Sequence, residues 1–138
     1  MLIDTGGLFT ALNDTEPDHE RTRRFVLETN EPLLLSPFVL AELDYLLATR
    51  AGVGDELALL DDVARGAYTL VAFAADEVAA ARNVIAQYRD LDIGLADASI
   101  VVLAARFRTN RVLTNDDRHF RVLRTLEGGT FQLLPADA

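Results

Sequence analysis

Two kinds of apolar pattern alternate along this chain. Short apolar runs predict buried strands, and longer segments in which apolar side chains recur every three or four positions predict helices. Short, apolar strands that alternate with helices are typical of a parallel sheet covered on both faces. The pattern therefore predicts an α/β fold with about five parallel strands. We expect strands at residues 2–3, 33–35, 68–73, 111–114 and 130–134, and helices at 8–13, 17–29, 37–50, 54–65, 75–88 and 95–108.

The segment from Asp92 to Leu103 stands out within this pattern. The apolar run Ala98–Ala105 leaves no polar face, as expected for the body of a buried helix. Asp97 lies in the first turn of that helix and shares a stripe with Ile100 and Val101. An acid that faces a core is costly unless positive charge meets it, and the helix N-terminus supplies only part of that charge.

Three other acids fall at comparable places. Asp4 and Asp116 follow predicted strands, and Glu42 shares a helical stripe with Phe38 and Val39, so we expect Glu42 to point inward. In doubly wound sheets, ligands bind in the crevice at the carboxyl ends of the strands. We therefore expect all four acids to meet in that crevice, although each has an ordinary interpretation as a turn, capping or ion-paired residue.

Four carboxylates in one crevice repel each other. At roughly 4–6 Å and an effective dielectric constant near 20, each pair costs about 3–4 kcal/mol, so the cluster must bind protons or a cation. An all-oxygen ligand set favours Mg²⁺ or Mn²⁺. Such ions activate water for in-line attack on a phosphodiester.

Residues near these acids have less certain roles. Thr114 either hydrogen-bonds a metal-bound water or ends its strand, and His119 is expected to be structural or to lie at the rim. We interpret Asp92 and Asp117 as loop or capping acids, and Arg118 as a rim residue that holds phosphates of a substrate.

Composition narrows the class of protein. The 138 residues, half of them hydrophobic, predict a single domain over residues 1–138 with a frayed acidic tail at 135–138. No apolar run is long enough to cross a bilayer, and no basic leader is visible. The absence of cysteine rules out disulfides and thiolate metal sites and fits a reducing compartment. We therefore expect a cytoplasmic protein that does not bind membranes.

The net charge of −9 argues against nucleic acid as a partner. All 13 basic residues are arginine, however, and the planar guanidinium suits phosphate. A solvated surface explains most members of the densest arginine cluster equally well. That cluster comprises Arg106, Arg108, Arg111, Arg118, Arg121 and Arg124.

Four motifs together resemble those of PIN-domain ribonucleases, and most closely the VapC toxins of prokaryotic toxin–antitoxin pairs. The resemblance spans residues 2–134, with the motifs in the family's order and at its separations. The motifs are Met-Leu-Ile-Asp-Thr at residues 1–5, Ser-Pro-Phe-Val-Leu-Ala-Glu-Leu at 36–43, Leu-Ala-Asp-Ala-Ser-Ile-Val at 95–101 and Val-Leu-Thr-Asn-Asp-Asp-Arg-His-Phe at 112–120.

The resemblance implies a PIN domain, a flavodoxin-like three-layer α/β/α sandwich. It matches Asp4, Glu42, Asp97 and Asp116 one for one with the family's metal-site acids, which hold one or two Mg²⁺ or Mn²⁺ ions. The implied activity is endonucleolytic cleavage of tRNA or ribosomal RNA by water. The implied partners are a VapB-type antitoxin, docked on the helical hairpin at residues 37–65, and a second copy of the chain.

The chain departs from the family's pattern at two positions, and two alternative functions share some of its features. Gly6 stands where the family often has a polar residue after Asp4-Thr5, and Asp117 competes with Asp116 for the fourth acid position; the spacing from Thr114 favours Asp116. A phosphoacceptor receiver domain also has an acid-lined Mg²⁺ site, but it uses a lysine that this chain lacks. A catalytically inactive PIN-fold docking module would use the acid pocket to receive an arginine.

Overall fold

Five short parallel strands form the centre of the protein. The computed structural model describes residues 1–138, and its strands pair in the order β3-β2-β1-β4-β5. All four pairings are parallel, with Leu2 on β1 opposite Leu34 on β2 and Val112 on β4. The strands are β1 (Leu2–Ile3), β2 (Leu34–Leu35), β3 (Thr69–Leu70), β4 (Arg111–Leu113) and β5 (Gln132–Leu134).

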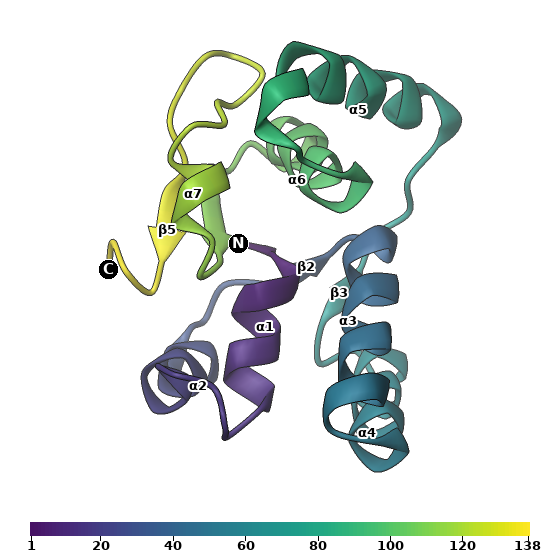
Figure 1. Ribbon diagram of the computed structural model, residues 1–138, viewed down its shortest axis with the longest axis vertical. Helices are drawn as coiled ribbons and strands as arrows, with labels where there is room; N and C mark the ends of the chain where they lie inside the picture. Colours follow the sequence, from purple (N-terminus) through teal and green to yellow (C-terminus); the bar gives the residue numbers. More distant parts are fainter.

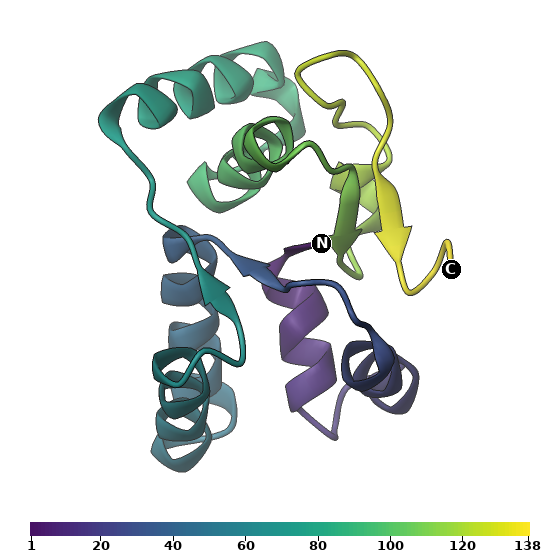
Figure 2. The same ribbon diagram turned by 180° about the vertical axis from the view of Figure 1, so that it is seen from behind.

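Helices lie on both sides of these strands. In Figures 1 and 2, α5 and α6 lie together on one side, and α1, α2, α3 and α4 lie on the other. The predicted α/β fold with a parallel five-stranded sheet is therefore confirmed. The helices are α1 (Thr5–Leu12), α2 (His19–Glu28), α3 (Pro37–Arg50), α4 (Val53–Ala64), α5 (Ala75–Gln87), α6 (Leu95–Phe107) and α7 (Asp117–Phe120), with a 3₁₀ turn η1 (Arg89–Leu91) before α6.

The strand predicted at residues 68–73 was too long. Only Thr69 and Leu70 pair, and both are exposed, because β3 is an edge strand of the sheet. The prediction treated this run as a fully buried strand, but only Tyr68 and Val71 are buried in it.

Helix α1 begins earlier than the pattern predicted. It starts at Thr5, so Gly6 and Gly7 lie in its first turn rather than in a loop before it. A side chain at Gly7 would place its Cβ 2.3 Å from the carbonyl oxygen of Leu113. Close packing of α1 against the end of β4 explains a glycine at this helical position, where intrinsic propensity alone disfavours it.

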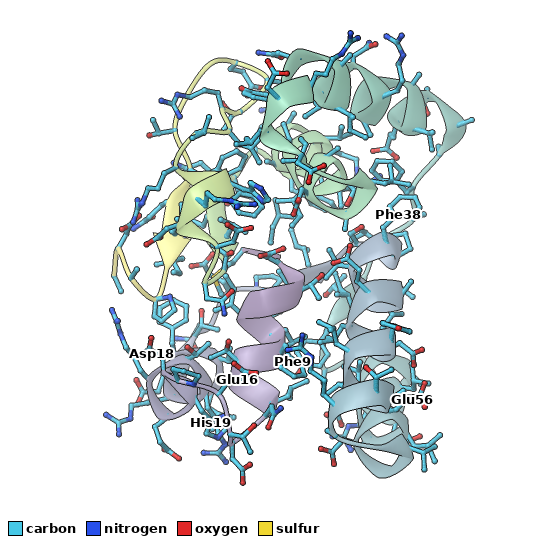
Figure 3. The ribbon with its side chains drawn as sticks, in the orientation of Figure 1. Phe9, Glu16, Asp18, His19, Phe38 and Glu56 are labelled. Carbon is cyan, nitrogen blue, oxygen red and sulfur yellow. The ribbon has the colours of Figure 1, made fainter.

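Helix α6 is buried along almost its whole length, as its composition predicted. Residues 98–104 are all buried, and α6 packs on α5, α3 and β1. Ser36 caps α3 by accepting a hydrogen bond from the Phe38 amide, and Pro37 follows at the first helical position, as expected. Figure 3 shows Phe38 at the start of α3. The ring of Phe38 packs edge-on against the ring of Phe73, with 5.1 Å between the ring centroids.

Asp137 in the C-terminal tail makes contacts with the rest of the domain. The Asp137 carboxylate accepts hydrogen bonds of 2.8 and 2.7 Å from the Arg121 guanidinium and one of 2.8 Å from the Leu133 amide. These contacts lower the pKa of Asp137 to about 2. No helix has the length and apolar character needed to cross a membrane.

Candidate metal centre

Asp4 lies at the centre of the site, directly after β1. Its backbone caps α1, but its carboxylate takes no part in the cap. Instead, Oδ2 accepts a 2.7 Å hydrogen bond from the hydroxyl of Thr114, which follows β4. Both side chains are buried. Because β1 and β4 are adjacent parallel strands, their carboxyl ends bring these two residues together.

A second threonine holds Glu42. The Thr5 hydroxyl donates a 2.9 Å hydrogen bond to Oε1 of Glu42, which joins the start of α1 to α3. Glu42 is exposed, so the prediction that it points inward was wrong. The buried row of α3 is Val39, Leu43 and Leu47. Glu42 lies beside this row, and its carboxylate reaches the hydroxyl of the buried Thr5.

Asp97 lies in the first turn of α6, as predicted, with about 20% of its side chain exposed. Burial raises the pKa of Asp97, and nearby Asp116 and Glu42 raise it further, whereas His119 acts in the opposite direction. The buried α6 stripe therefore carries an acid that interacts electrostatically with two of the other candidate acids.

Asp116 begins α7, a helix of four residues that the sequence pattern did not predict. Its Oδ1 accepts a 3.0 Å hydrogen bond from the His119 amide and so caps the helix. Its own amide donates to the Thr114 hydroxyl at 2.9 Å. Thr114 thus contacts Asp4 and Asp116 at once. The alternative prediction, that Thr114 only ends its strand, does not account for these contacts.

His119 contributes more to the site than the sequence suggested. Its Nδ1 lies 2.8 Å from Oδ2 of Asp116 and 3.8 Å from Oδ2 of Asp97. The contact with Asp116 has the distance of an ion pair but not the directed geometry of a hydrogen bond. The sequence did contain a signal for this contact, because a residue three positions after a helix-capping acid lies beside that acid.

The remaining candidates lie at the edge. Arg118 is exposed, forms no ion pair and lies 3.3 Å from the His119 ring through its Nη2. Asp117 is mostly exposed and forms a 3.7 Å ion pair with Arg121, which leaves Asp116 as the acid that faces the cluster. Asp92 is exposed, with left-handed backbone at φ 60°, and ends the turn η1.

The electrostatics of the cluster suit a divalent cation. Burial raises the pKa of Asp4 to about 7; the Thr114 hydrogen bond opposes this, and repulsion from Asp97 and Asp116 adds to it. No three acidic or histidine side chains are spaced to hold one ion together. The carboxylates are thus near enough to repel each other, although no three of them converge on one point. The donor set, all carboxylate oxygen, fits Mg²⁺ or Mn²⁺.

Comparison with known proteins identifies the family of this chain. Residues 1–125 match the model of the PIN domain family. The chain is 45% identical over 135 residues to Ribonuclease VapC26 of Mycobacterium tuberculosis, covering 98% of this chain and all of that protein.

Two crystal structures share the fold at 17% identity. One is Mycobacterium tuberculosis VapC20, a Sarcin-Ricin loop cleaving toxin, with a TM-score of 0.78 over 83% of this chain and 88% of that chain. The other is VapBC2 from Rickettsia felis bound to a fragment of promoter DNA, with a TM-score of 0.67 over 96% of both chains. The chain therefore belongs to the PIN-domain family and, within it, to the VapC ribonucleases.

Proposed function

We propose that this protein is the endoribonuclease toxin of a VapBC-type pair and that it cleaves structured RNA, either tRNA or ribosomal RNA, in the cytoplasm. The observation that carries the proposal is the buried carboxyl of Asp4, whose pKa is raised to about 7 beside Asp97 and Asp116. A group of acids that resists ionisation is stabilised by a cation. The names of the relatives, a ribonuclease and a toxin that cleaves the Sarcin-Ricin loop, support RNA as the substrate.

We assign one or two Mg²⁺ or Mn²⁺ ions to Asp4, Glu42, Asp97 and Asp116. When bound, such an ion supplies positive charge at the scissile phosphate and lowers the pKa of a water molecule. Thr114 and Thr5 each fix one carboxylate oxygen, on Asp4 and Glu42 respectively.

The side chains around these acids would then position the phosphodiester and move the proton. We assign to Asp97, which is partly exposed, the role of accepting the proton of the attacking water. His119 contributes positive charge between Asp97 and Asp116 when it is protonated. Arg118, which is free of carboxylate partners, is available to hold a flanking phosphate.

The acidic surface of the chain is compatible with this function. A net charge of −9 limits non-specific attraction to RNA, so binding depends on the ion and on a few arginines at the site.

Cleavage of RNA tests the proposal directly. Purified protein is incubated with total RNA in Mg²⁺ or Mn²⁺ and in parallel with excess EDTA, and the 5′ ends of the products are sequenced. We expect discrete new ends only with the metal, at a small number of tRNA or ribosomal RNA positions. Equal cleavage in EDTA would contradict the metal-dependent mechanism.

No three side chains are spaced to bind one ion together, and this favours an alternative function. In that alternative the protein is an inactive docking module whose acids bind an arginine. A calorimetric titration with Mn²⁺ separates the two. Saturable binding below millimolar concentration supports the nuclease, and no binding at millimolar Mn²⁺ supports the docking module.

We further propose that a VapB-type antitoxin docks on the α3–α4 hairpin and that the toxin forms a homodimer. The hairpin exposes Tyr45, Val53 and Leu57, with exposed fractions of 68, 64 and 54%, beside acids that would attract a basic partner. An acidic substitution, Tyr45→Asp, should prevent co-purification of the antitoxin encoded beside the gene. Leu27→Asp, at an equally exposed position on α2, should not.

A further inference from the structure

We propose that Asn115 is a positioning residue for the acidic crevice and that it acts through Gly6 and Thr10 of α1. The inference rests on the proposed function, because it concerns how the acids are held for an ion. Asn115 lies between Thr114 and Asp116 in the turn that links β4 to α7. Its side chain has no hydrogen bond to any of the four acids but reaches across to α1.

The side chain of Asn115 occupies the space where a side chain at position 6 would lie. A Cβ built on Gly6 would be 2.3 Å from Asn115 Oδ1 and 3.2 Å from Asn115 Cγ. The first distance is too short for any real contact, and the backbone of Gly6 is not in the left-handed region. Space, rather than backbone conformation, therefore favours glycine at position 6 as long as the Asn115 side chain keeps this position.

A hydrogen-bonded bridge completes this contact. Asn115 Nδ2 donates to the Thr10 hydroxyl at 3.0 Å, and that hydroxyl donates to the Gly6 carbonyl at 2.8 Å. Thr10 is buried, so its hydroxyl is shielded from competing water. The carboxamide thus contacts two successive turns of α1, and the bridge ties the β4–α7 turn to the helix that Asp4 caps.

The turn held in this way controls the placement of two acids. The residue before Asn115 donates to Asp4, and the residue after it caps α7 with its carboxylate and donates its amide to the Thr114 hydroxyl. A shift of the turn relative to α1 would therefore change the separation of Asp4 from Asp116. Gly6 and Asn115 form a complementary pair in which a small residue on one element accommodates a polar residue on the other.

A double-mutant cycle tests the contact in the metal-free protein. The variants are Gly6→Ala, Asn115→Ala and the double variant, with Asn83→Ala on the exposed surface of α5 as the control. Gly6→Ala should lower the melting temperature in the presence of Asn115, because the new methyl group meets Oδ1. In the Asn115→Ala background it should be neutral or raise the melting temperature, because alanine is the better helix former once the clash is gone. Additive changes in melting temperature would overturn the complementary pair.

Mn²⁺ affinity, measured by calorimetry, tests the positioning role. Loss of a group that orients metal ligands typically weakens metal binding about 10–100-fold, and we expect Asn115→Ala to fall in this range while Asn83→Ala matches wild type. Unchanged Mn²⁺ affinity in Asn115→Ala would overturn this inference alone. If the KM for RNA also rose while the Mn²⁺ affinity stayed the same, the result would indicate that Asn115 contacts the substrate directly, which likewise overturns the inference. Absence of Mn²⁺ binding by the wild-type protein would instead overturn the proposed function.

Discussion

The hydroxyl of Thr114 donates a 2.7 Å hydrogen bond to the carboxylate of Asp4, although the two residues are 110 positions apart in sequence. The bond stabilises the ionised form of a carboxyl that burial would otherwise keep protonated. Thr114 also accepts a hydrogen bond from the Asp116 amide, so one hydroxyl fixes two of the acids.

Replacing Thr114 by valine should reduce metal-dependent cleavage about 10–100-fold, because the buried carboxylate loses its donor and the Asp116 amide loses its acceptor. Thr114→Ser keeps the hydroxyl and serves as the matched control. Initial rates of RNA cleavage at several Mn²⁺ concentrations provide the measurement. Equal rates for the valine and serine variants would show that the hydroxyl does not matter.

Asp97→Asn should abolish cleavage and leave the fold intact. The amide keeps the shape of the side chain but removes a negative charge that Asp116 and Glu42 oppose, so stability should be unchanged or higher. Cleavage assays and thermal melts of the metal-free protein measure the two effects, with Asp14→Asn, an exposed acid outside the site, as the control. If the Asp97→Asn protein cuts RNA at the wild-type rate, the role assigned to this acid is wrong.

The positions of Asp4, Asp97 and Asp116, unlike the direction of Glu42, could be predicted because they follow from general rules. Residues after adjacent parallel strands must meet at one edge of the sheet, which places Asp4 beside Thr114 and Asp116. The apolar stripe of α6 likewise predicted the direction in which the Asp97 side chain points. The direction of Asp97 needs only the helical period, which the pattern of apolar residues contains. That β1 and β4 are neighbours is seen in the structure and was not predicted from the sequence.

The contacts that hold the acids could not be predicted in the same way. Helix α7 has only four residues, too few for a periodic pattern, so His119 was expected to be structural or to lie at the rim, and its contacts with two acids were not predicted. Gly6 looked like part of a turn because glycine is a poor helix former. Its packing against Asn115 depends on how closely α1 approaches β4, and no local pattern contains that distance.

Stability of the metal-free protein should fall as the pH rises from about 4 to about 7. The Asp4 carboxyl has an ordinary pKa of 3.8 when unfolded and a pKa of about 7 when folded, so in this window the folded state binds more protons. The free energy of unfolding therefore decreases with pH, by at most on the order of 4 kcal/mol once Asp4 is fully ionised. Below pH 4 this penalty is absent.

Thermal melts in EDTA between pH 4 and pH 8 measure this dependence. Asp4→Asn should match wild type near pH 4 and be more stable at pH 8, and Mn²⁺ should raise the melting temperature of wild type but not of Asp4→Asn. Asp14→Asn is again the control. Parallel pH profiles for wild type and Asp4→Asn would contradict the raised pKa.

The only two serines of the chain form a buried link between α3 and α6, and their removal should be non-additive. Ser36 Oγ lies 2.7 Å from Ser99 Oγ, which donates to the Ala96 carbonyl, so Ser36 is the donor between them while it accepts from the Phe38 amide. Ser99→Ala leaves the Ser36 hydroxyl hydrogen without a partner and should cost about 1–3 kcal/mol. Ser36→Ala removes the cap of α3 and should cost about 1 kcal/mol.

The double variant should cost less than the sum, because Ser36→Ala removes the donor that Ser99→Ala would leave unsatisfied. Urea unfolding at neutral pH measures each free energy, and we expect a coupling of about 0.5–3 kcal/mol. Since α3 carries Glu42 and α6 carries Asp97, we expect each single variant also to weaken Mn²⁺ binding. Free energies that add within about 0.5 kcal/mol would mean that the two hydroxyls act independently.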